Sequence, residues 1–175
     1  YPKIHKVEIE GNDDLGTSKI TDVMRLKEES HFNPAYQERD KEEILKLYKN
    51  EGFINTTVNF KVEAGEDPNK VIFKVIINEG EKILIEQIKI HGLKHIDEDE
   101  MKKILESQET TILKGNQTFS NIKKKNDIMR LLTFARMKGF IFARVTRYDI
   151  RIDWVDPEYR DSRGYYIDIE VDEGP

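Results

Sequence analysis

Histidines and clustered carboxylates are the side chains with which this chain could bind a metal or transfer a proton. His91 and His95 have the i, i+4 spacing of two ligands on a helix, but Gly92 and an expected strand-to-helix turn lie between them. The acidic run at residues 97–100 is typical of a helix N-terminus, where carboxylates meet the helix dipole. Neither a glycine-rich phosphate loop nor a nucleophile elbow is present. We therefore predict no enzymatic activity, no metal site and no cofactor.

The composition narrows the class of partner. The chain has 175 residues, is 36% charged with a net charge of −5, and contains no cysteine, so disulfides and thiolate metal sites are excluded. Its one basic cluster, at residues 123–138, falls on an expected helix and is typical of a solvated face, so no nucleic-acid partner is indicated. No apolar run approaches the ~20 residues that cross a bilayer. The chain begins at Tyr1 without an initiator Met or a signal segment, which favours a fragment or a processed product.

Two copies of one pattern make up the chain. Residues 4–11 and 85–92 share an alternating apolar rhythm that ends in Gly. A Gly-Phe pair and a terminal Glu-Gly then recur in the same order, and the equivalent glycines lie 81, 87 and 94 residues apart. The growing spacing places the insertions in loops, which tolerate changes of length. We predict two domains, at residues 1–80 and 81–175.

Each copy predicts a strand, two helices and two further strands. In the first copy Thr17 or Ser18 can cap the first helix. The second helix begins with Asn33 as N-cap and Pro34 at the first helical position, and it ends at Gly52. The equivalent capping residues of the second copy are Asp97, with Glu100 three residues on, and Ser120.

The two copies differ in their second strands. From Phe32 to Val58 the first copy aligns with the second without a gap at an offset of 87 residues. The next apolar positions are replaced by Arg147 and Asp149, and the apolar stripe continues on the opposite parity. Such a shift moves the stripe to the other face of the strand unless a bulge absorbs it. We predict a β-bulge or a strand break near Thr146 to Arg147; the alternative is an outer face that is also covered.

This order of elements predicts an α+β fold. If the two helices form an antiparallel hairpin that covers one face, each domain has a three-stranded mixed sheet of order 1-3-2. The second strand is then an exposed edge, which can accept another chain by β-augmentation, whereas side chains such as Val58 face the core. The candidate protein-binding residues are Asn55, Thr56, Thr57, Val58, Asn59 and Phe60 in the first copy and Arg144, Thr146 and Tyr148 in the second.

The ordered motifs resemble those of POTRA domains. Each copy has Phe, Leu and Gly-Phe at the same spacing along the second helix and ends in Glu-Gly, and an Ile-x-Ile-x-Gly pattern opens the second copy. The residues that carry the resemblance are Phe32, Leu45, Gly52 and Phe53 in the first copy and Phe119, Leu132, Gly139 and Phe140 in the second. The resemblance covers nearly the whole chain and implies two POTRA-like domains.

The function that the resemblance implies is that of a non-catalytic polypeptide-binding scaffold. POTRA arrays precede the β-barrel of outer-membrane assembly proteins of the BamA type. By resemblance the chain would lie in the periplasm, at the outer membrane, and engage unfolded outer-membrane proteins partly by β-augmentation. The implied partners are accessory lipoproteins, neighbouring POTRA domains and a C-terminal β-barrel. The alternatives are the POTRA region of a two-partner secretion pore or an organelle import pore, or a structural cell-division scaffold.

Overall fold

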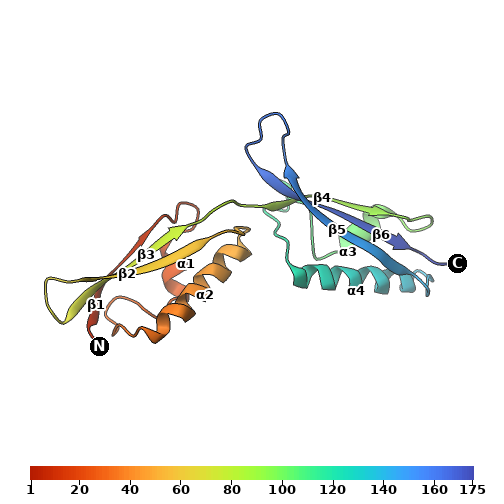
Figure 1. Ribbon diagram of the computed structural model, residues 1–175. Helices are drawn as coiled ribbons and strands as arrows, with labels where there is room; N and C mark the ends of the chain where they lie inside the picture. The colour runs from red at the N-terminus through yellow and green to blue at the C-terminus, as the bar shows by residue number, and fades with distance from the viewer. The chain divides into compact units, whose positions relative to one another are not determined.

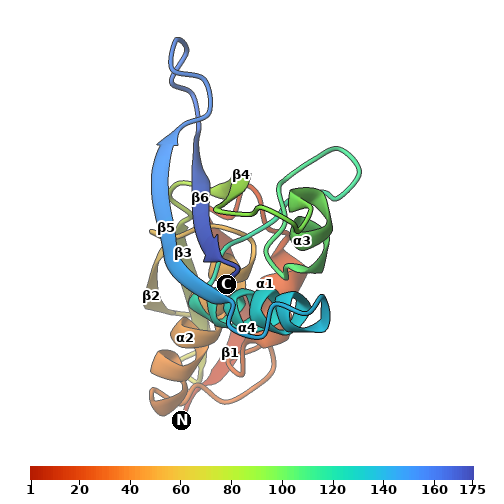
Figure 2. The same ribbon diagram turned by 90° about the vertical axis from the view of Figure 1, so that its right-hand side faces the viewer.

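The computed structural model describes residues 1–175, which divide into two compact units. Unit 1 comprises Tyr1–Glu81 and unit 2 comprises Lys82–Pro175. Each unit contains a strand, two helices and two further strands in that order (Figures 1 and 2). No helix combines the length and the apolar character needed to cross a membrane.

Unit 1 is a three-stranded sheet with two helices on one face (Figure 1). Its elements are β1 (Lys3–Glu10), α1 (Thr17–Val23), α2 (Ala35–Asn50), β2 (Thr57–Ala64) and β3 (Lys70–Asn78). The central strand is β3, which runs parallel to β1 and antiparallel to β2. Its alternating residues Phe73, Val75 and Ile77 are buried against the helices. The predicted mixed sheet of order 1-3-2 is confirmed.

Unit 2 repeats this architecture with a longer hairpin. Its elements are β4 (Leu84–His91), α3 (Glu98–Ile104), α4 (Asn121–Met137), β5 (Arg144–Trp154) and β6 (Arg163–Asp172). The sheet order is β4-β6-β5, again with the last strand in the centre. The register of β5 against β6 shifts between Val145 and Arg147, so the predicted β-bulge at Thr146 is confirmed. After the bulge, Tyr148 and Ile150 turn toward the core.

The helix starts show two wrong predictions, one at α1 and one at α2. The N-cap of α1 is Gly16, not Thr17 or Ser18, and no side chain caps this helix. The N-cap of α2 is Pro34, not Asn33, and the helix begins at Ala35, although Asn33 Oδ1 still accepts a hydrogen bond from the amide of Ala35 at 3.0 Å. The caps of unit 2 are as predicted, with Asp97 accepting from the Glu100 amide and Ser120 from the Lys123 amide.

Glycine closes the first strand of each unit for a steric reason. Gly11 and Gly92 have φ values of +81° and +82°, a region that side chains disfavour. A Cβ atom on Gly11 would lie 1.9 Å from the carbonyl oxygen of Ile77, and one on Gly92 would lie 2.3 Å from that of Val171. The chain can therefore leave the first strand beside the central strand only with glycine at this position.

Candidate protein-binding edges

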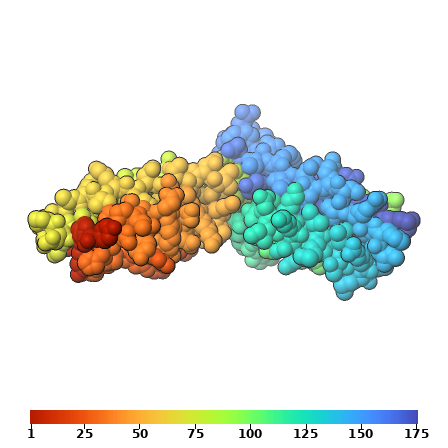
Figure 3. All heavy atoms as spheres, turned by 60° about the horizontal axis from the view of Figure 1, so that its bottom comes forward, coloured from red at the N-terminus to blue at the C-terminus, as the bar shows by residue number.

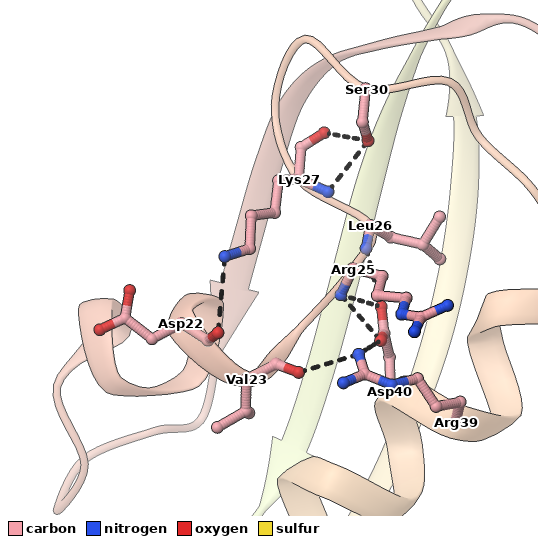
Figure 4. A network of polar contacts seen from close by, with 8 residues as sticks. All are labelled: Asp22, Val23, Arg25, Leu26, Lys27, Ser30, Arg39 and Asp40. Carbon is pink, nitrogen blue, oxygen red and sulfur yellow. Dashed lines mark hydrogen bonds and ion pairs between the residues drawn. The ribbon is translucent and has the colours of Figure 1, made fainter.

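A buried carboxylate on the long helix fixes the segment after the short helix of unit 1. Asp40, on α2, has no exposed surface. Its carboxylate accepts hydrogen bonds from the amides of Arg25 and Leu26, each at 2.8 Å, and from Arg39 Nη1 at 2.8 Å (Figure 4). These charge-assisted bonds offset the cost of burying the charge. Asp40 therefore ties the end of α1 to α2.

Unit 2 contains the equivalent carboxylate, 87 residues further on. Asp127, on α4, accepts from the amides of Glu106 and Ser107 at 2.6 and 3.2 Å. A third bond comes from the Tyr148 hydroxyl of β5, at 3.0 Å. Burial and the neighbouring Asp127 carboxylate raise the pKa of this hydroxyl, so it remains a donor at neutral pH. This contact joins α4 to β5 inside the unit.

A second carboxylate, in the terminal Glu-Gly motif, fixes the loop before the short helix. Glu79 accepts from the amides of Asp14 and Leu15 and from the Tyr48 hydroxyl at 2.9 Å. In unit 2 the carboxylate of Glu173 accepts from three consecutive amides and from His95 Nδ1. The donors are the amides of Lys94, His95 and Ile96, all at 3.0 Å, and the His95 ring at 2.9 Å. The recurring Glu-Gly motif is therefore a structural anchor.

The pKa of Glu173 shows how strongly this anchor favours the ionised form. Burial opposes ionisation, but the donated hydrogen bonds outweigh it and hold the pKa of Glu173 at about 2. His95 Nδ1 contacts Glu173, whereas His91 Nε2 contacts Asp168 at 2.8 Å. The two histidines thus have separate carboxylate partners.

One edge of each sheet is closed by the unit's own chain. On β1 the amide of Ile4 donates to the carbonyl of Ser30 at 2.8 Å, and the amide of Val7 donates to the Glu28 carboxylate. On β4 the amides of Ile85, Ile88 and Ile90 are all occupied. Their acceptors are the Gln117 carbonyl, the Glu109 carboxylate and the Glu98 carboxylate, respectively. A visiting strand would have to displace these contacts.

The other edge of unit 1, on β2, is open. The amide of Gly65 donates to the carbonyl of Lys70 at 2.9 Å, and Ala64 pairs with Val71. Because hydrogen-bonded pairs alternate along an antiparallel ladder, every second β2 residue turns its amide and carbonyl away from β3. The residues with outward backbone groups are Val58, Phe60, Val62 and Ala64. We call this row the β2 edge.

The corresponding edge of unit 2 is partly occupied. The amide of Val155 donates to the carbonyl of Ser162, so the outward residues of β5 are Tyr148, Ile150, Ile152 and Trp154. Lys124 Nζ donates to the carbonyl of Tyr148 at 3.3 Å, and the amide of Trp154 donates to Asp153 Oδ1 at 2.9 Å. Only the stretch from Ile150 to Ile152 offers backbone groups free of these contacts.

The structure places the predicted residues of unit 1 in two groups. Asn55 and Thr56 lie before β2, so the expectation that they belong to the strand is wrong. The Thr56 hydroxyl donates a hydrogen bond to the carbonyl of Glu79 at 2.8 Å. Thr57 and Asn59 are exposed, but both pair with β3 through their amides. Val58 is 1% exposed. Phe60 stacks on Phe73 with 5.1 Å between ring centroids.

The predicted residues of unit 2 contribute less to an edge. Arg144 begins β5 and pairs with Asp172 at 2.8 Å. Thr146 lies in the bulge, and its hydroxyl donates to the carbonyl of Glu170. Tyr148 points inward to Asp127. Val62 and Ala64, which extend the β2 edge, are not among the predicted binding residues. The alternation of residues along β2 contained the relevant signal, but the register of the β2–β3 hairpin was needed to tell which amides point outward.

Together the fold and the closed and open edges define a class of protein. Each unit is a small β-α-α-β-β module with a mixed sheet and internal carboxylate anchors, and its second-strand edge is open in unit 1 and partly occupied in unit 2. The POTRA family, described as a surface antigen variable number repeat, matches residues 2–80 and 83–174. The chain belongs to the POTRA family.

Known proteins agree with this assignment. The chain is 27% identical over 177 residues to outer membrane protein assembly factor BamA of Nitratidesulfovibrio vulgaris, covering 99% of the chain and 21% of that protein. It is 24% identical over 144 residues to a putative outer membrane protein assembly factor of Treponema pallidum, covering 82% of the chain and 17% of that protein. The chain thus spans about a fifth of the length of these relatives.

Solved structures share the fold. POTRA domains 3–5 of Haemophilus influenzae BamA match with a TM-score of 0.55 at 19% identity, covering 99% of this chain and 67% of that one. The N-terminal domain of Omp85 from Thermosynechococcus elongatus matches with a TM-score of 0.52 at 17% identity, covering 98% and 63%.

Proposed function

We propose that this chain is a periplasmic scaffold of an outer-membrane protein assembly machine, and that it holds unfolded clients or partner proteins at the β2 edge. Two relatives are named as outer-membrane protein assembly factors, which supports the cellular role. By resemblance, neighbouring POTRA domains, a C-terminal β-barrel and accessory lipoproteins complete the machine. Clients that are still unfolded present extended backbone, which an open strand edge can pair with irrespective of sequence.

The observation that carries the proposal is the contrast between the closed and open edges of unit 1. The first-strand edge of the sheet is occupied by residues 28–30, whereas no such contact covers the outward amides of Val58, Phe60, Val62 and Ala64. These four residues extend over seven positions of one strand, enough for several main-chain hydrogen bonds to an added strand. The β5 edge is shorter, because Lys124 and Asp153 occupy its ends. We therefore assign the main client contact to β2.

Proline at Val62 tests this assignment. The Val62 amide points away from β3 and its side chain is 39% exposed, so Val62→Pro removes an outward donor at modest cost to the fold. Thr57 is unsuitable for this test because its amide pairs with Asn78 of β3. Val62→Thr retains the amide and a β-branched side chain, and it is the matched control.

The assay is fluorescence anisotropy with a labelled peptide of about ten residues from a transmembrane strand of an outer-membrane protein. We expect Val62→Pro to weaken binding at least about fivefold, while Val62→Thr stays within about twofold of the parent. Equal affinity of all three proteins, with unchanged circular dichroism spectra, would rule out client pairing at the β2 edge.

A further inference from the structure

Unit 2 carries an apolar groove between its two helices that the edge contacts do not use. The groove has a volume of about 480 Å³. Its lining includes Lys103 and Ile104 of α3 and Met129, Arg130, Phe134 and Met137 of α4. Met129 and Met137 are 61% and 81% exposed. The α4 segment, cyan in Figure 3, lies at the surface of unit 2.

The first copy provides an internal comparison. At the offset of 87 residues, Met129 aligns with Glu42 and Met137 aligns with Asn50. The two methionines therefore replace a charged and a polar residue on the same outer face of the long helix. Exposed helix positions carry no folding requirement for apolar side chains, and unit 1 folds with polar ones. The apolar surface of α4 thus calls for an explanation outside the unit's own core.

The charges around the groove favour an acidic partner. The long helix of unit 1 has four basic and four acidic residues, whereas α4 has five basic and one acidic. Two cations, Lys103 and Arg130, line the groove, and no carboxylate does. Arg130 lies 3.9 Å from Glu106, a weak ion pair, and donates to the carbonyl of Ile104 at 3.2 Å. Lys103 thus forms no ion pair, and Arg130 forms only this weak one.

Two of the three α4 lysines argue against a membrane surface as the occupant. Lys123 Nζ donates to the carbonyl of Thr118 at 2.7 Å, and Lys124 Nζ donates to that of Tyr148 at 3.3 Å. The first two lysines of the basic cluster are thus directed at the unit's own backbone. A polybasic patch that binds lipid headgroups needs its cations free and on one face. A recess between two helices also accommodates one more helix better than a flat bilayer.

We propose that the α3–α4 groove docks an acidic amphipathic helix of a partner protein. Apolar anchors one or two turns apart would contact Ile104, Met129, Phe134 and Met137, and flanking carboxylates would pair with Lys103 and Arg130. Methionines suit such a surface, because their flexible, polarisable side chains adapt to different apolar anchors. This site is distinct from the β2 edge and does not depend on client pairing there.

The test uses three synthetic 15-residue peptides and the whole 175-residue chain. The probe is a helical peptide with Leu at i, i+3, i+4, i+7 and i+11 and Glu and Ala elsewhere. One control has the same composition with the Leu positions scrambled, and the other replaces Glu by Lys. Binding is measured by fluorescence anisotropy, and the site is mapped by amide chemical-shift changes in NMR spectra.

Two groove variants carry the equivalent residues of the first copy. One is the double variant Met129→Glu with Met137→Asn, and the other is the single variant Arg130→Glu. Tyr159→Asn, an exposed residue of the β5–β6 hairpin, is the matched control. We expect that only the acidic probe binds, and that the amide chemical shifts of Ile104 and Phe134 change on binding. Both groove variants should bind the probe at least about tenfold more weakly, and the control variant should bind it with unchanged affinity.

Several outcomes would overturn the proposal. These are no binding of the acidic probe at millimolar concentration, equal binding of the scrambled or Lys peptide, or shift changes confined to β5. The chain could instead bind vesicles containing anionic phosphatidylglycerol and not the probe. If Met129→Glu with Met137→Asn abolishes that vesicle binding, the occupant of the groove is a lipid surface. Loss of binding of the ten-residue strand peptide in Val62→Pro would concern the β2 edge alone. It would leave the proposal for this groove unaffected.

Discussion

Replacing Glu173 by Gln should destabilise unit 2 in a pH-dependent way. Gln keeps the shape of the side chain but removes the charge that accepts from the amides of Lys94, His95 and Ile96. The pKa of Glu173 is held at about 2, below its ordinary value of 4.5, and this difference corresponds to about 3 kcal/mol of folding free energy. The His95 side chain is 69% exposed, so solvent screens its share. We expect a loss of about 2 to 3 kcal/mol at pH 7.

The sign of the pH dependence follows from the lowered pKa. The native state binds fewer protons than the unfolded state between about pH 4.5 and 2, so this contribution is complete above pH 4.5 and disappears as the pH falls toward 2. The gap in unfolding free energy between parent and Glu173→Gln should therefore shrink by roughly 2 kcal/mol from pH 7 to pH 3. Urea unfolding followed by fluorescence reports on unit 2, because Trp154, the one tryptophan of the chain, lies on β5. A gap that stays constant between pH 7 and pH 3 would refute the ionised anchor.

Three further predictions concern the scaffold and its edges. Asp127→Ala should cost about 3 kcal/mol of unfolding free energy in the Trp154-monitored unfolding of unit 2, because it leaves two buried amides and the Tyr148 hydroxyl unpaired. Tyr148→Phe removes only one of these bonds and should cost about 1 kcal/mol. Equal costs of the two substitutions would contradict the shared anchor. Gly92→Ala should destabilise unit 2 more than Gly139→Ala in the same assay. Both glycines have positive φ, but only Gly92 has a carbonyl oxygen close to where the added Cβ atom would lie. Similar losses of stability in the two variants would refute the steric argument. Ile152→Pro should leave binding of the strand peptide within about twofold of the parent, and a loss as large as that of Val62→Pro would move the client site to β5.

Much of the scaffold could be predicted because it depends on local signals. Glycine stops, caps and apolar alternation are read from neighbouring residues, and the repeat confirmed each element a second time. The bulge at Thr146 was predictable for the same reason, since a change of parity between aligned strands has few physical solutions. The cap of α1 was wrongly predicted because Thr17 and Ser18 were both available, and only the path of the preceding loop makes Gly16 the N-cap.

The candidate site was less predictable because it depends on long-range geometry. Amide direction on β2 follows from the bond between Gly65 and Lys70, which the sequence pattern does not contain. Asp40 and Asp127 were visible as an aligned pair, but their role required the position of the chain after the short helix. Predicting the groove on α4 required knowledge of which helix face lies outside the core. Methionine is a residue type common in cores, so the sequence alone does not show that Met129 and Met137 are exposed.

Hydrogen exchange at single amides tests client pairing at the β2 edge most directly. The outward amides of Val58, Phe60, Val62 and Ala64 should exchange rapidly in the free chain and become protected when the strand peptide is added at saturating concentration. The amides of β1 that already donate to residues 28–30 should not change. Protection of the four β2 amides is the predicted result; protection that arises only on β1, or none on β2 while the peptide is bound, would contradict the account.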